Sequence, residues 1–302
     1  MRVLSCLLLI IPLGTAAADT PLVQPADVPV VAASGTRIIR DLEYTTGGGK
    51  ARSLDLYLPA PTLVPLPLVV WIHGGSWRGG DKAKNKSAFL SAHGFATASL
   101  NYRLLQEAPF PAQIQDCKAA IRFLRAHAAE FNLDPTRIGV WGESAGGNLA
   151  ALLGTTDRVA ELEGTGHGGQ SRIQAVCDWF GPTDMPTLLA HAKTVPPTSP
   201  LAKETKTILD LLGETPSAEV QRQASPLAFV SRDDAPFFIL HGDQDPLVPL
   251  GQSEALCAAL RAAGVEASLL VLPGAGHGGA AFETPAVQAR IHEFFATHLS
   301  VQ

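Results

Sequence analysis

The stretch "RIGVWGESAGGNLAALLG" restricts the fold of this chain more than any other. A short apolar run typical of a buried strand leads into Gly142-Glu-Ser144-Ala-Gly146, and an apolar helical run follows at once. In a strained strand-to-helix turn of this kind, no bulky side chain fits two positions to either side of the serine. The serine hydroxyl then projects above a sheet at a helix N-terminus, which favours developing negative charge. The alternative, a glycine-rich turn with a helix-capping serine, is disfavoured by the strand before it and the helix after it.

Short β-rich runs alternate with longer helical runs along the rest of the chain. The first two runs, "RIIRDLEY" and "SLDLYLP", are joined by the turn-forming "TTGGGKAR", which predicts an antiparallel hairpin. The later strand-like runs are "PLVVWIH", "FATASLNY", "RIGVWG", "IQAVCDWFG", "PFFILHG" and "EASLLVL". Helices are expected near residues 112–131, from residue 144, over 251–263 and over 286–298. The pattern predicts an α/β fold with a mostly parallel central sheet and helices on both faces.

Residues 185–232 break this alternation. They hold six prolines around one convincing short helix, "KETKTILDLLG". A long irregular segment is uncommon in a compact domain unless it covers a site, so we expect a small inserted cap. The cap would belong to one domain over residues 37–302. Residues 19–36, rich in Pro, Val and Ala, are expected to form a loosely ordered lead-in.

The N-terminal stretch "MRVLSCLLLIIPLGTAAADT" has one early cation, an apolar run and then three small residues. This order predicts a secretory signal peptide over residues 1–18, cleaved after Ala18, and therefore a secreted or periplasmic protein. An anchoring helix is disfavoured because Pro12 and Gly14 interrupt a run shorter than the roughly 20 apolar residues that a span needs. Lipid attachment at Cys6 is disfavoured because Cys6 precedes most of the apolar run. We expect no stable membrane insertion after cleavage.

Charge and cysteine content argue against several classes of protein. The formal net charge is -5 and the 23 basic residues are scattered, so the chain lacks the basic footprint of a nucleic-acid-binding protein. Removal of the signal would leave Cys117, Cys177 and Cys257, an odd number, so at least one thiol stays unpaired. Each lies in an apolar run, and we expect buried free thiols. Neither HExxH nor CxxC occurs, so no metal and no cofactor is expected.

A serine nucleophile needs a base and a carboxylate, and the strand-turn-helix motif implies the chain order Ser, Asp, His. "PFFILHGDQDPLVP" ends a strand-like run in two aspartates, and "LLVLPGAGHGG" ends the next one in a loop with His277. Both groups would emerge at the same edge of the sheet as Ser144. We predict Asp245 as the acid. Asp243 lies too near the strand end to reach outward, and Asp184 follows an earlier strand.

The loop "HGGSWRGGDK", residues 73–82, follows a strand-like run and has two interpretations. A phosphate-binding loop needs G-x-x-x-x-G-K-[ST], and no glycine pair at this spacing is followed by lysine, since Lys82 comes too late. The other interpretation is an oxyanion hole built from exposed backbone N–H groups. Each such donor would lower the activation free energy by roughly 3 kcal/mol. The predicted donors are the backbone N–H groups of Gly75, Ser76 and Ala145. Arg78 and Lys82 would then be solvated rim charges.

With these motifs assembled, the chain resembles the α/β-hydrolase superfamily and, within it, the esterase/lipase group related to hormone-sensitive lipase. The resemblance rests on "HGGSWRGGDK", "NYRLLQEAPFPAQIQD", "GESAGG", "DWFGPTD" and "HGDQDPLVP" and runs over residues 37–298. Within this group, the chain is similar to secreted bacterial carbohydrate and feruloyl esterases, in which the motif HGGxWxxGDK is usual. The resemblance implies Ser144 as nucleophile, Asp245 as acid and His277 as base. Ser76 departs from the group's common third glycine and would narrow the acyl site.

The sequence therefore predicts a secreted serine carboxylic-ester hydrolase that works through an acyl-enzyme. Its expected substrates are acetyl or feruloyl esters of carbohydrates, or other short-chain esters. A serine peptidase or amidase of the same fold is one alternative, disfavoured by the lack of an added substrate-selecting domain. A non-catalytic binding module is another, disfavoured because all three triad residue types are present. Trp77 and Trp179, with Phe180, are candidates for an aromatic-accepting pocket, although such residues are at least as often core.

Overall fold

The computed structural model describes residues 30–31, 35–157 and 159–300. The predicted signal peptide, residues 1–18, lies outside the described residues, as does most of the predicted lead-in. Within that lead-in, β1 (Val30–Val31) pairs antiparallel with the next strand. This part of the lead-in is therefore an edge strand of the sheet.

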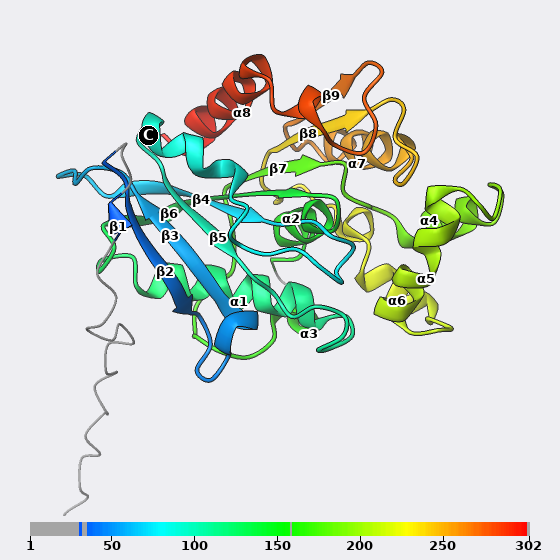
Figure 1. The fold of residues 1–302 in the computed structure, drawn as a ribbon, viewed down its shortest axis with the longest axis horizontal. Helices are drawn as coiled ribbons and strands as arrows, with labels where there is room; N and C mark the ends of the chain where they lie inside the picture. The colour runs from blue at the N-terminus through cyan, green and yellow to red at the C-terminus, as the bar shows by residue number, and fades with distance from the viewer. Residues whose placement is uncertain (1–29, 32–34, 158, 301–302) are drawn as a thin grey trace, which may run out of the picture.

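The described residues form one nine-stranded sheet with the order β1-β2-β3-β5-β4-β6-β7-β8-β9 (Figure 1). The first three strands and the β3–β5 pair are antiparallel, and all pairs from β5 to β9 are parallel. The strands after β1 are β2 (Arg37–Glu43), β3 (Ser53–Leu58), β4 (Leu66–Ile72), β5 (Ala96–Leu100), β6 (Leu133–Glu143), β7 (Ala175–Trp179), β8 (Phe237–Gly242) and β9 (Ala267–Leu272). The predicted hairpin and the mostly parallel sheet are both confirmed.

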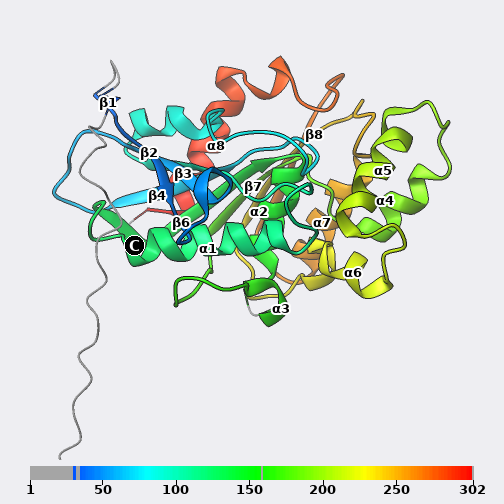
Figure 2. The same cartoon turned by 60° about the horizontal axis from the view of Figure 1, so that its bottom comes forward.

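Helices cover both faces of the sheet, because its central strands are apolar on both sides. Alternate residues of β4 belong to two separate hydrophobic clusters, one for each face. One face packs against α1 (Ala112–Ala126), α2 (Ala145–Thr155) and α7 (Gly251–Ala262), and the other against the 3-10 helix η2 (Lys86–His93) and α8 (Pro285–His298). Figure 2 shows α1 and α8 on opposite sides of the sheet. The short α3 (Ala160–Glu163) contacts α1.

The segment between β7 and β8 is helical over much of its length. It contains α4 (Met185–Ala192), α5 (Pro200–Leu212), α6 (Ala218–Gln223) and the 3-10 helix η3 (Pro226–Phe229). Helices α4 to α6 lie together at one end of the molecule, at the right of Figure 1. The expectation of one helix here is wrong, because several of the prolines lie in the first turn of a helix, where proline is tolerated.

The three cysteines of the described chain are free and buried, which confirms the prediction for Cys117, Cys177 and Cys257. Burial raises the pKa of each thiol, so all three remain protonated and unreactive near neutral pH. Within the described ranges, no helix is both long enough and apolar enough to span a bilayer.

Candidate active site

Ser144 lies between the end of β6 and the start of α2, in a strained backbone conformation with φ 54° and ψ -120°. A Cβ atom on Gly142 would lie 2.1 Å from the carbonyl oxygen of Gly146, and one on Gly146 would lie 2.1 Å from the carbonyl oxygen of Ile72. Only glycine fits at either position. The backbone N–H of Ser144 donates to the carbonyl oxygen of Trp179 at 2.8 Å, so β7 holds the turn in place.

The imidazole of His277 bridges Ser144 and Asp245. Its Nδ1 lies 2.6 Å from Asp245 Oδ2, and its Nε2 lies 2.8 Å from Ser144 Oγ. An ionised carboxylate only accepts hydrogen bonds, so Nδ1 carries the proton and Nε2 presents a lone pair to the serine hydroxyl. Asp245 comes from the loop after β8 and His277 from the loop between β9 and the 3-10 helix η4 (Ala280–Phe282). The structure therefore brings the three predicted residues together.

Asp245 is held by donors on both carboxylate oxygens. Its Oδ1 accepts the backbone N–H groups of Leu247 at 2.8 Å and Val248 at 2.9 Å. Its Oδ2, besides contacting His277, lies 3.3 Å from Nε2 of the buried His241. Burial alone would raise the pKa of Asp245, but the hydrogen bonds from His241, His277 and Val248 outweigh it and hold the pKa well below its usual value. The acid therefore stays ionised beside the base.

The two competing aspartates have other partners. Asp243 Oδ1 accepts the backbone N–H of Gly274 at 2.7 Å and so stabilises the turn after β9. Asp184 precedes α4, and its backbone N–H donates to Gln252 Oε1 at 2.8 Å. In the described part of the chain, Asp245 is the carboxylate in contact with His277.

The glycine-rich loop after β4 lies directly against the nucleophile turn. A Cβ atom on Gly74 would lie 3.3 Å from Ser144 Cβ. The next two residues have positive φ, 109° at Gly75 and 55° at Ser76, and within the described chain their N–H groups make no intramolecular hydrogen bond. Ala145 is the first residue of α2, where backbone N–H groups lack an intrahelical partner. The three predicted donors thus lie on the two segments next to Ser144.

The cations of this loop differ in environment. Lys82 is buried, and its Nζ pairs with Asp41 at 2.7 Å and with Asp55, so the expectation of a solvated rim charge is wrong for Lys82. Its backbone N–H also donates to Asn101 Oδ1 at 2.7 Å. Lys82 therefore anchors the far end of the loop to the β2–β3 hairpin. Arg78 is exposed and donates to Thr207 Oγ1 on α5 at 3.1 Å.

The predicted aromatic pocket residues belong to the core. Trp77 and Trp179 are only 3% and 1% exposed, so neither indole has surface left for a substrate. Trp179 packs against Trp141 with a ring distance of 5.0 Å. The ring of Phe180 lies 4.5 Å from the ring of His277 and covers the imidazole. Phe180 directly follows β7, so it lies at the same edge of the sheet as the loop that carries His277. This position in the sequence could have indicated the contact.

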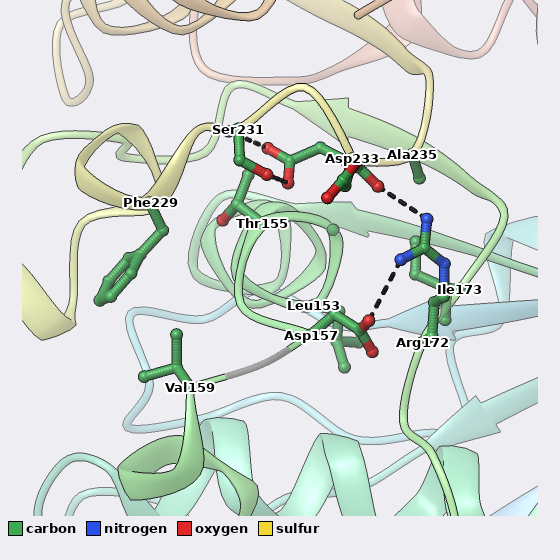
Figure 3. A pocket seen from close by; sticks show the side chains of 12 residues that line it. Leu153, Thr155, Asp157, Val159, Arg172, Ile173, Phe229, Ser231, Asp233 and Ala235 are labelled. Atoms are coloured by element: carbon green, nitrogen blue, oxygen red, sulfur yellow. Dashed lines mark hydrogen bonds and ion pairs between the residues drawn. The ribbon is translucent and has the colours of Figure 1, made fainter. Parts of the chain in front are cut away.

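A pocket of about 290 Å³ lies at the other end of α2 and is shown in Figure 3. Arg172 lines it, pairing with Asp157 at 3.2 Å and donating to the carbonyl oxygen of Asp233 at 2.7 Å. The 11 residues of α2 separate this pocket from Ser144 by about 15 Å, so it is not the site of the triad. Among the described residues, no group of three or more His, Cys, Asp and Glu side chains is placed to hold a metal ion.

A serine in the turn from β6 to α2, an acid after β8 and a base after β9, all at one edge of a mostly parallel sheet, is the arrangement of the α/β hydrolases. The chain matches the model of one family over residues 54–260. It belongs to the BD-FAE family.

Individual relatives agree with this placement. Esterase LipQ of Mycobacterium tuberculosis is 31% identical over 78% of this chain and 56% of its own length. The solved structure of a truncated carbohydrate esterase from gut microbiota is 33% identical, with a TM-score of 0.78 over 87% of this chain and 96% of that one. A bifunctional GH43-CE protein of Bacteroides eggerthii is 33% identical, with a TM-score of 0.75 over 87% of this chain and 35% of that one. The chain spans about half the length of the curated relatives it matches.

Proposed function

We propose that the protein hydrolyses carboxylic esters through an acyl-enzyme formed on Ser144. The observation that carries the proposal is the His277 imidazole, hydrogen-bonded to Asp245 on one side and to Ser144 on the other. Membership of the BD-FAE family and the named esterases among its relatives support the same reaction.

In this mechanism Ser144 Oγ attacks the ester carbonyl carbon while His277 Nε2 takes the hydroxyl proton. The carbonyl oxygen becomes an oxyanion and accepts hydrogen bonds from the three N–H donors named above. Collapse of the tetrahedral intermediate breaks the bond to the alcohol, which leaves with the proton from His277. Water then gives a proton to His277 and attacks the acyl carbon. The bond from that carbon to Ser144 Oγ breaks, His277 returns the proton to Ser144 Oγ, and the carboxylic acid leaves. Asp245 stabilises the imidazolium in both halves.

The test is hydrolysis of p-nitrophenyl acetate by the wild type and by Ser144→Ala. The wild type should turn the ester over, and Ser144→Ala should lose it by a factor on the order of 10⁴ or more, since removal of a triad member costs that much. A matched control is Ser231→Ala, a serine in the distant pocket beside Asp234. Equal activity of wild type and Ser144→Ala would refute the proposal.

For the natural substrate we propose acetyl or feruloyl esters of carbohydrates, with simple short-chain esters as the alternative. The carbohydrate esterase from gut microbiota among the similar structures supports this class. A screen of p-nitrophenyl esters of increasing acyl length, methyl ferulate and acetylated xylan separates the possibilities. An ester and an amide with the same leaving group, assayed side by side, test the peptidase alternative, and we expect the ester alone to react.

We further propose that the protein is secreted or periplasmic. The support is the order of one cation, an apolar run and small residues in residues 1–18. Mass spectrometry of the mature protein from the medium or periplasm should find Asp19 as the first residue. An intact N-terminus on protein confined to the cytoplasm would contradict this.

A further inference from the structure

Three charged side chains meet beside the nucleophile turn and take no part in the mechanism above. Lys86, the first residue of η2, places its Nζ 2.8 Å from Glu143 Oε2 and 2.8 Å from Glu283 Oε1. Glu143 directly precedes Ser144, and Glu283 lies at the end of η4, in the segment that follows His277. One ammonium group therefore joins the turn that carries the serine to the segment that carries the imidazole.

The Lys86 ammonium has a third partner. Its Nζ lies 5.3 Å from the centre of the Trp179 ring, a cation–π distance. The carbonyl oxygen of Trp179 in turn accepts the backbone N–H of Ser144 at 2.8 Å. Burial alone would lower the pKa of Lys86, but hydrogen bonds to Glu143 and Glu283 outweigh it and raise the pKa, so the group is charged at any working pH. Lys86 thus contacts three segments that surround the nucleophile.

Glu143 lies where an unpaired negative charge would hinder the reaction. A Cβ atom on Gly74 would lie 3.2 Å from Glu143 Cγ, so the Glu143 side chain packs against the glycine-rich loop after β4. A free carboxylate on the residue before Ser144 would oppose the developing oxyanion, and its negative charge would favour the protonated form of the imidazole that is hydrogen-bonded to Ser144. The other ionisable groups of this region are His73 directly after β4, Tyr102 after β5, Asp178 on β7, His241 on β8 and Asp245 in the loop after β8.

We propose that Lys86 is a positioning residue for the ester hydrolysis. Its charge offsets that of Glu143, and its two ion pairs fix the position of the Ser144 turn relative to the segment that follows His277. The inference rests on the proposed function, because its effect appears in the kinetics of that reaction.

The first experiment compares the pH profile of kcat/KM for p-nitrophenyl acetate in wild type, Lys86→Met and Lys86→Arg. Lys86→Met should lower kcat about tenfold with little change in KM, because the lost charge acts on the transition state. It should also move the acidic limb of the profile to higher pH by about half a unit or more, because the exposed Glu143 charge favours imidazolium. Lys86→Arg keeps the charge and should restore the wild-type limb. Lys84→Met, at an exposed lysine two residues before Lys86, is the matched control and should change neither kcat nor the position of the limb.

The second experiment separates charge from packing. Glu143→Gln alone removes one of the two negative charges that surround Lys86 and leaves Lys86 paired with Glu283, so it should move the acidic limb to lower pH, the opposite direction. Combined with Lys86→Met, it should bring the limb back toward the wild-type position. Glu143→Gln also keeps the proposal testable if thermal melting shows that Lys86→Met does not fold.

An acidic limb that stays in place in both single variants would overturn the role of Lys86, even where kcat falls, because packing alone does not move the limb. The two proposals fail separately. If the wild type hydrolyses the ester and Ser144→Ala does not, an unmoved limb overturns the role of Lys86 alone. If the folded wild type is inactive, the proposed function itself is wrong.

Discussion

At the residue scale, the site depends on backbone positions that restrict their side chains. Ser144 and Ser76 both have positive φ, where residues other than glycine are strained. At Ser144 the strained backbone holds the side chain where its hydroxyl group is hydrogen-bonded to His277. At Ser76 the side chain is partly exposed and lies on the glycine-rich loop after β4.

Ser76→Gly should widen the acyl preference. Removing the side chain from the loop enlarges the space for the acyl group, and glycine adopts this φ without strain. We expect the ratio of kcat/KM for p-nitrophenyl butanoate to that for the acetate to rise several-fold, by analogy with a methylene in a pocket, which is worth roughly 10-fold or more. An unchanged ratio would show that the Ser76 side chain points away from the acyl group.

Asp178 in β7 is a buried carboxyl group behind the nucleophile turn. Its Oδ1 accepts the backbone N–H of Gly181 at 3.0 Å, and its Oδ2 has no partner among the described residues. Burial raises the pKa of Asp178 to about 6, against the lowering effects of Gly181 and His241. The folded state then holds the proton more tightly than the unfolded chain does. Ionisation therefore costs stability as pH rises from about 4 to about 6, by up to about 3 kcal/mol.

Asp178→Asn removes this titration. The free energy of unfolding of the variant, relative to wild type, should rise between about pH 4 and pH 6 and stay level above that range. Urea denaturation of both proteins across this range measures the difference, and other titrating groups cancel in the comparison. Two curves that run parallel from pH 4 to pH 8 would contradict the buried-charge explanation.

At the element scale, the helical insertion between β7 and β8, which contains α4, α5 and α6, is hydrogen-bonded to α2, the helix that begins after Ser144. Asn148, buried on α2, donates from Nδ2 to the carbonyl oxygen of Pro182 at 2.8 Å and to that of Ala224 at 3.0 Å. These two carbonyls flank α4, α5 and α6. One side chain therefore holds both ends of the helical insertion to the helix that starts after Ser144.

Asn148→Ala should release this insertion. Two buried carbonyl groups lose their donor, and we expect a loss of about 2 to 4 kcal/mol in the free energy of unfolding. Limited proteolysis should also cut within α4 to α6 earlier than in wild type. Lys193→Ala, at an exposed residue of the same insertion, is the control and should stay within about 0.5 kcal/mol. Unchanged stability and proteolysis in Asn148→Ala would show that other contacts hold the insertion.

At the scale of the whole molecule, the parts that follow from local pattern were predictable. The apolar runs and the turn around Ser144 predicted the parallel sheet, and strand order along the chain placed Asp245 and His277 at the same edge. The burial of Lys82 was not predictable, because its partners Asp41 and Asp55 are distant in sequence and meet it only across the folded sheet.

Two further features were missed for related physical reasons. The prolines of the insertion suggested an irregular segment, whereas Pro186 and Pro200 lie in the first turns of α4 and α5. Trp179 was expected near a substrate because it ends a strand, but its indole lies on the same face of the sheet as Trp71 and Trp141 and forms a cluster of three buried tryptophans with them. Packing of this kind depends on which face each strand residue takes, and a strand buried on both faces carries no signal of that choice.

The central claim is that Ser144 is an activated nucleophile in an esterase. The most direct measurement is reaction of the folded protein with a fluorophosphonate, followed by mass spectrometry of its peptides. The account predicts a stoichiometric adduct on Ser144 and none in a folded His277→Ala variant, which lacks the base. A folded wild-type protein that never labels, or an adduct on a different serine, would contradict it.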